Sequence, residues 1–182
     1  MSIPHIPALR RGQPYESLDK AEIKSVRTGE TIAVVSQVNS GVIRRDLRRQ
    51  NRDCLKKFSL DQLIEMCRKA GDVFMTGKIE ISEGFTQTPE QYIDALSHTS
   101  GLPHSLIRRN MAKINQVLTE MDIILKGLTR GLDHAVIDHG TGEQAGMPVS
   151  FFAVTESLGV VLPSNSPGVN SLWIPSLALK VP

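Results

Sequence analysis

Apolar and polar positions alternate along two short stretches near the start of the chain, residues 21–26 and 31–36. A short loop containing Gly29 separates the two stretches, and this arrangement predicts a β-hairpin. From about residue 42 onward, apolar residues recur instead every three or four positions, which is the period of an amphipathic helix. The pattern therefore predicts a hairpin followed by a largely helical region, whose first helix covers residues 42–57.

Two capping boxes mark where the next helices begin. Ser59 and Gln62 form the first box, directly ahead of a run with helical periodicity. Thr88 and Gln91 form the second box, with a proline at the first helical position, and that helix should run to about residue 100. Each box supplies partners for backbone amides that the first turn of a helix leaves unbonded.

A longer apolar stripe predicts a single helix over residues 103–128. Such a stripe is far more often part of a core than a cofactor contact. The following residues, 132–143, gather two histidines and three acids in a glycine-bearing stretch. His134 and His139 are five positions apart and no second pair of ligands accompanies them, so a solvent loop is favoured over a metal site.

The last part of the chain has β-rich character. Residues 147–155 and 157–162 are two runs typical of strands, and the second ends in a short buried strand over residues 160–162. That strand enters the turn Pro163-Ser-Asn165-Ser-Pro167, and a short amphipathic helix follows. A turn between the carboxyl end of a strand and the start of a helix is where open α/β sheets hold ligands.

The overall composition is that of an ordinary globular chain of 182 residues, with 40% hydrophobic and 22% charged residues and a net charge of +2. Residues 1–19 contain three prolines and indicate an extended arm. No apolar run is long enough to span a bilayer and no signal layout is visible at the start, so we expect a cytoplasmic protein without a membrane partner. The two cysteines, Cys54 and Cys67, are interpreted as buried reduced thiols.

A basic stripe lies on the first predicted helix and is formed by Arg44, Arg45, Arg48, Arg49 and Arg52. Aromatic residues that could stack on bases do not interleave with it, and the net charge is near neutral, so nucleic acid is not the expected partner. A solvated helix face or a contact to another subunit is favoured.

The Pro163–Pro167 turn, together with the β-rich runs before it and the short helix with Trp173 and Pro175 after it, resembles the aldehyde dehydrogenase superfamily. Members of that superfamily carry a Pro-aromatic-Asn-aromatic-Pro turn at the corresponding point. In this chain Ser164 and Ser166 replace the aromatic residues, a departure that leans toward the acyl-CoA-reducing branch. The resemblance covers most of the chain, and it is closest after about residue 140.

The resemblance implies a fold and a set of roles. It implies an α/β fold of the aldehyde dehydrogenase type, with Asn165 as the donor that polarises the substrate carbonyl. Val161, Leu162, Pro163 and Ser164 would line the nicotinamide half of NAD or NADP, and no metal is implied. The substrate would be a small aldehyde or acyl thioester, and the protein would be a homo-oligomer.

The same resemblance implies how the chain is divided. Residues 1–19 would be the arm, 20–140 the hairpin and helical part of the cofactor domain, 141–158 the oligomerisation and crossing strands, and 159–182 the start of the nucleotide-binding fold. Relatives of this kind are much longer, and their catalytic cysteine lies beyond the Asn turn. We therefore expect the chain to be the amino-terminal portion of a longer enzyme.

Three functions follow as hypotheses. The first is NAD(P)-dependent oxidation of an aldehyde through a cysteine thioester. The second runs the chemistry in reverse, as an acyl-CoA reductase that makes an aldehyde. The third is a non-catalytic helical interaction module that uses the basic stripe to bind an acidic partner.

Overall fold

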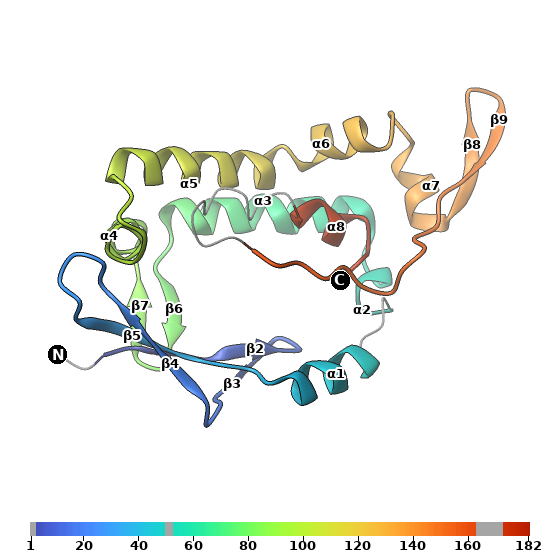
Figure 1. The fold of residues 1–182 in the computed structure, drawn as a ribbon. Coiled ribbons are helices and arrows are strands. Elements are labelled where there is room, and N and C mark those ends of the chain that lie inside the picture. The colour runs from blue at the N-terminus through green and yellow to red at the C-terminus, as the bar shows by residue number, and fades with distance from the viewer. Residues whose placement is uncertain (1–2, 50–52, 163–172) are drawn as a thin grey trace. The chain divides into compact units, whose positions relative to one another are not determined.

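The computed structural model describes residues 3–49, 53–162 and 173–182. They form two compact units, each built from two stretches of chain. The first unit comprises Met1–Gln50 and Thr76–Arg109, and the second comprises Asn51–Met75 and Asn110–Pro182. Both units combine helices with small sheets, so the chain is a mixed helix-and-strand protein (Figure 1).

The first unit is organised around a three-stranded sheet. Strand β5 (Thr31–Ser36) lies in the middle, antiparallel to β4 (Lys20–Lys24) and parallel to β1 (His5–Ile6). The β4–β5 hairpin confirms the strand pair that the alternation of apolar residues predicts. Gly29 has a φ of 76° in the connecting turn, a conformation in which an L side chain would be strained.

The amino-terminal residues are extended, but they are also paired into sheets. After β1, strands β2 (Ala8–Arg10) and β3 (Gln13–Tyr15) form an antiparallel hairpin. Its two-residue turn, Arg11 and Gly12, has positive φ at both positions, as the tight hairpin turns require.

The region predicted as one helix over residues 42–57 contains two helices within the described chain. Helix α1 (Ser40–Arg49) begins two residues earlier than expected, because the side chain of Asn39 accepts a hydrogen bond from the Val42 amide at 3.0 Å. Helix α2 (Asp53–Lys56) follows.

A second hairpin of the first unit, β6 (Ile79–Ser82) with β7 (Phe85–Gln87), leads into α4 (Pro89–Ser100). The capping box of α4 forms as predicted: the Thr88 side chain accepts from the Gln91 amide, and the Gln91 side chain accepts from the Thr88 amide. The helix ends at Gly101, whose φ of 75° is left-handed.

The second unit is mainly helical. Helix α3 (Leu60–Thr76) begins at its predicted capping box, where the Ser59 amide donates to the Gln62 side chain at 2.9 Å. It packs beside α5 (His104–Thr119) so closely that a Cβ at Gly71 would lie 2.8 Å from the Asn115 side-chain oxygen.

The long helix predicted over residues 103–128 is interrupted at Glu120, and α6 (Met121–Leu128) follows α5 after the break. The Thr119 hydroxyl donates to the backbone oxygen of Asn115 at 3.0 Å, the kind of side-chain bond that bends helices.

Four further elements complete the second unit. They are α7 (His134–His139), the hairpin of β8 (Thr141–Gln144) with β9 (Met147–Ser150), and α8 (Ile174–Ala178). Side chains from the four helices α3, α6, α7 and α8 form its core, with Leu60, Ile64, Met121, Leu125, Ile137 and Ala178 all buried. No helix among the described residues combines the length and the apolar character needed to cross a bilayer.

Candidate functional site

Only part of the predicted site lies within the residues that the structure describes. Pro163, Ser164 and Asn165 lie outside the described residues, whereas Val161 and Leu162 lie inside them. Residues 159–162 form no strand in the described structure. Val161 is 98% exposed and Leu162 is 44% exposed, so the prediction of a buried strand here is wrong. A strand needs a hydrogen-bonded neighbour, and none of the described strands pairs with these residues.

The chain that leads to this point is apolar and exposed. Phe152, Val154, Leu158 and Val160 each leave more than a third of their surface open to solvent. Hydrogen bonds that hold this segment include those from the Phe151 amide to the Gly140 oxygen and from the Leu158 amide to the Pro182 oxygen, both at 2.9 Å. The strand predicted over residues 147–155 ends at Ser150, because Ser150 pairs with Thr141, the first residue of its partner β8.

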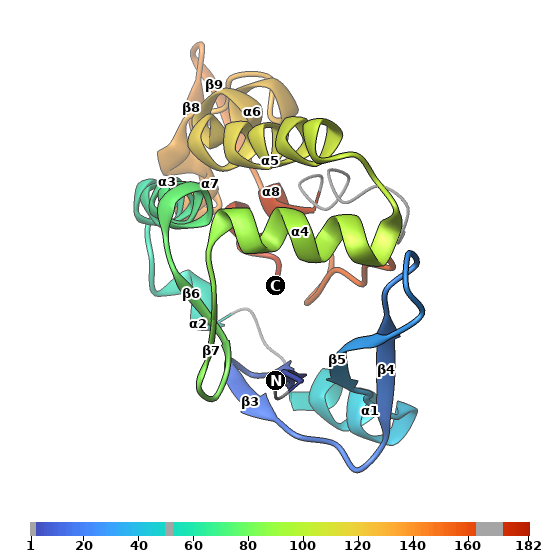
Figure 2. The same cartoon turned by 90° about the vertical axis from the view of Figure 1, so that its left-hand side faces the viewer.

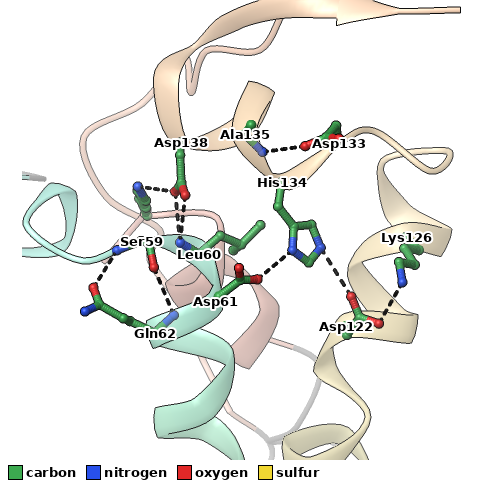
Figure 3. Close-up of polar contacts among 11 residues, drawn as sticks. Ser59, Leu60, Asp61, Gln62, Asp122, Lys126, Asp133, His134, Ala135 and Asp138 are labelled. Atoms are coloured by element: carbon green, nitrogen blue, oxygen red, sulfur yellow. Dashed lines mark hydrogen bonds and ion pairs between the residues drawn. The ribbon is translucent and has the colours of Figure 1, made fainter.

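A buried ion pair anchors the end of the chain to the second unit. The Lys180 ammonium lies 2.6 Å from an Asp138 carboxylate oxygen, and Lys180 is 6% exposed. The same carboxylate accepts from the Leu60 amide, at 2.9 Å and 3.2 Å from its two oxygens (Figure 3). Asp138 therefore caps the first turn of α3 from α7, and Lys180 neutralises it.

A second cluster joins α3, α6 and α7 through His134 (Figure 3). Its Nδ1 lies 2.9 Å from an Asp61 oxygen and its Nε2 lies 3.2 Å from an Asp122 oxygen. Asp122 also accepts from the Lys126 ammonium at 2.9 Å, and this hydrogen bond lowers the pKa of Asp122. His134 thus lies between carboxylates from two other helices, so the arrangement acts as a clamp between α3, α6 and α7.

These contacts correct the predicted loop over residues 132–143. Residues 134–139 form α7, which Asp133 caps by accepting from the Ala135 amide at 2.8 Å. His134 and His139 are its first and last residues. Among the described residues, no three histidine, cysteine or acidic side chains gather in a geometry that could hold a metal ion.

The two cysteines differ in their surroundings. Cys67 is half-buried against the core of the second unit, and burial raises the pKa of its thiol. Cys54 is exposed, so the prediction that both thiols are buried is wrong for this residue. Its place on the short helix α2 leaves it on the surface.

The basic stripe lies on the exposed side of α1. Arg44, Arg45, Arg48 and Arg49 line a shallow hollow of about 430 Å³, and Arg52 lies outside the described residues. The one acid of α1, Asp46, is already bound by Arg10 through two hydrogen bonds of 2.7 Å, which lower the pKa of Asp46.

Sequence reasoning missed the two clusters around Asp138 and His134. Lys180 is far from Asp138 along the chain, and His134 is farther still from Asp61, so no local spacing signals either pair. Only the packing of α3, α6, α7 and α8 brings these side chains together.

Comparison with known proteins adds no relative. No family model matches the chain, and no curated protein matches it.

Proposed function

We propose that this chain is the amino-terminal portion of an NAD(P)-dependent enzyme of the aldehyde dehydrogenase type, which oxidises an aldehyde through a cysteine thioester. The observation that carries the proposal is the turn Pro163-Ser-Asn165-Ser-Pro167, approached by the apolar run Val160–Leu162. Two prolines fix the backbone on either side of the asparagine, whose amide is a neutral hydrogen-bond donor suited to a developing oxyanion.

The described residues support the proposal in two ways. The β8–β9 hairpin precedes the run and lies within residues 141–158, where the resemblance implies oligomerisation strands. Val160, Val161 and Leu162 are strand-forming or apolar side chains that the described chain leaves exposed. Exposed apolar residues of this kind fit a surface that another part of the enzyme covers.

In the reaction that the resemblance implies, a cysteine thiolate adds to the aldehyde carbonyl and a hydride then passes to NAD(P)+. Water would then hydrolyse the acyl thioester, which gives the carboxylic acid and returns the cysteine thiol. In this chain Asn165 would donate to the carbonyl oxygen as it gains charge, and Val161, Leu162, Pro163 and Ser164 would lie along the nicotinamide. The thiolate and the general base would come from residues that the 182-residue chain does not contain.

The first test is the natural gene product itself. Its intact mass should lie well above the 20.0 kDa of this chain. The purified product should reduce NAD+ or NADP+ in the presence of an aldehyde, measured as absorbance of the reduced nicotinamide. A product of this chain's own mass that leaves both nucleotides unchanged would refute the enzyme assignment.

The acyl-CoA-reducing direction is the second function to test, because Ser164 and Ser166 replace the aromatic residues of the turn. An acyl-CoA reductase exchanges the thioester with a thiol and needs no general base for hydrolysis, whereas aldehyde oxidation to the acid needs one. Oxidation of NAD(P)H that depends on an acyl-CoA would favour the reductase. Acid formation without coenzyme A would favour the dehydrogenase.

A non-catalytic interaction role has one specific observation in its favour. Asp46 is the only acid of α1, and Arg10 donates hydrogen bonds to both of its carboxylate oxygens. The helix therefore offers the four described arginines of the stripe no other carboxylate to pair with. An acidic peptide such as polyglutamate should then bind with an affinity that falls steeply as salt rises. Arg44→Glu with Arg48→Glu should abolish this binding, whereas the control Lys113→Glu on α5 should preserve it.

A further inference from the structure

The first unit contains an apolar cavity that the proposed reaction does not use. Its volume is about 380 Å³, within the range of small-molecule sites. Its lining residues come from the three-stranded sheet, α4 and the β6–β7 hairpin. Figure 2 shows these elements of the first unit. The lining residues all belong to the first unit, and they are Pro4, Ile6, Ile23, Ile32, Ala33, Ile81, Gln87, Tyr92, Ala95, Leu96, His98 and Thr99.

Hydrogen bonds at the end of α4 hold one wall of the cavity in place. The Val26 amide donates to the His98 oxygen at 2.8 Å, and the Ser25 hydroxyl lies 3.1 Å from His98 Nδ1. The Arg27 guanidinium donates to the Ser97 hydroxyl at 2.5 Å, and that hydroxyl donates to the Leu102 oxygen at 2.8 Å. Ser25 and Ser97 are buried at 2% and 0% exposure. These contacts attach the carboxyl end of α4 to the turn that follows β4.

The other end of α4 is held by its capping box and by the hairpin that precedes it. Between the two ends, the residues that line the cavity from α4 include the small Ala95 and Thr99. The facing sheet surface also includes a small residue, Ala33, which pairs with Ile23 of the neighbouring strand. A helix fixed at both ends over small side chains cannot settle onto the sheet, so space remains beneath it.

The chemistry of the lining defines what can fill this space. Isoleucine, leucine, alanine and proline form most of the wall, and none of the described residues that line it is Asp, Glu, Lys or Arg. Gln87, Tyr92, His98 and Thr99 add hydrogen-bonding groups, and burial raises the pKa of the Tyr92 phenol, which keeps it neutral. An ionised ligand would lose its hydration here without gaining an opposite charge.

Every residue that lines this pocket is half-buried, so its apolar wall lacks packing contacts on the side that is open to solvent. An apolar molecule restores those contacts and removes its own surface from water at the same time. We propose that the first unit binds an uncharged aliphatic molecule with a single hydrogen-bonding head group in the cavity between its sheet and α4. This proposal is independent of the enzyme assignment, since it uses no residue beyond Arg109.

A series of straight-chain primary alcohols of increasing length tests the proposal on the 182-residue chain. Binding is followed by NMR of isoleucine methyl groups. The methyl signals of Ile6, Ile23, Ile32 and Ile81 should shift saturably, whereas those of Ile64 and Ile137 in the second unit should not. Affinity should rise by about fourfold for each added methylene until the cavity is full. Alkylammonium ions of matched length should bind at least about tenfold more weakly, because no carboxylate lines the cavity.

Two substitutions fill the space from opposite walls. Ala95→Leu fills it from α4 and Ala33→Leu fills it from the sheet, so each should abolish the saturable shifts. Each should also raise the midpoint of thermal unfolding, since the added side chain covers apolar surface of the open pocket. Asp94→Leu places the same side chain at an exposed position of α4 and is the matched control, which should bind as the unmodified chain does.

Three results would overturn the proposal. The first is the absence of saturable shifts at the four isoleucines with every alcohol. The second is unchanged binding in a folded Ala95→Leu or Ala33→Leu variant, which would place the site elsewhere. The third is equal affinity for alcohols and alkylammonium ions, which would mean that the wall does not discriminate charge.

Discussion

The two units of this chain are stabilised in different ways. The second unit closes around side chains with no exposed surface, among them Leu60, Met121 and Leu125, and it buries an ion pair beside them. The first unit leaves every residue of β5 half-buried and keeps a cavity under α4. Its buried residues include the apolar Ile93 and Ile107, but also Ser25 and Ser97, which hold α4 by hydrogen bonds.

The difference between the units indicates where side chains can be truncated at little cost in stability and where a ligand can bind. A close-packed core loses stability when even one methylene group is removed, because neighbouring atoms cannot fill the gap. A unit whose elements are joined by hydrogen bonds at their ends has less to lose from truncation in the middle, and its open space can hold a ligand. The next three predictions test this contrast.

The largest expected effect is in the core of the second unit. Leu125→Ala should lower the free energy of unfolding by about 3–5 kcal/mol, because Leu125 is 0% exposed and its loss leaves a cavity. Ile32→Ala in β5 should cost only about 1 kcal/mol, since Ile32 is half-buried and already borders open space. Urea unfolding followed by circular dichroism measures both, and equal losses would contradict the contrast between the units.

A somewhat smaller loss should follow removal of the buried cation. Lys180→Met should cost about 3 kcal/mol, because it leaves the Asp138 carboxylate without its counter-charge in a setting that is only 20% exposed. The substitution does not alter the strain at this position, where φ is 61°, since both side chains are unbranched.

The matched control for Lys180→Met is the double variant Lys180→Met with Asp138→Asn. Its amide oxygen can still accept from the Leu60 amide, so most of the stability should return. If the single and double variants unfold at the same urea concentration, the uncompensated charge is not the cause of the loss.

The smallest effect should be the acid dependence of the first unit. The Arg10 guanidinium lowers the pKa of Asp46, so the pair contributes stability above the unfolded pKa of roughly 4. This contribution should disappear as pH falls through the lower, folded-state pKa. Asp46→Asn should therefore have a flatter stability profile than the unmodified chain below about pH 4. Parallel profiles for the two proteins would show that the pair is not coupled to folding.

The predictions that the structure confirms rest on sequence signals that act over a few neighbouring residues. Ser59 with Gln62 and Thr88 with Gln91 act within one turn of helix, so their spacing alone defines the start of α3 and α4. The alternation in residues 21–26 and 31–36 likewise defines a strand pair joined by a short turn. In both kinds of structure the backbone groups find hydrogen-bond partners within a few residues along the chain, so a local sequence pattern predicts them well.

The errors came where partners lie far apart or where a local bond competes with a pattern. Val160 to Leu162 have a strand-like composition, but a strand also needs a neighbour that the described chain does not supply. The apolar stripe over residues 103–128 continues through Glu120, yet the Thr119 hydroxyl bond accompanies a break there. The β6–β7 hairpin was missed because each of its strands offers too few apolar positions to establish alternation.

The proposed function depends on Asn165 acting where the substrate carbonyl gains charge. Turnover of the natural gene product with an aldehyde and NAD(P)+ tests this most directly, comparing Asn165→Ala with the control Asn170→Ala. The account predicts that Asn165→Ala lowers turnover by an amount equivalent to about 2–4 kcal/mol of transition-state stabilisation, while the control stays close to the unmodified enzyme. Equal turnover in both variants would contradict it.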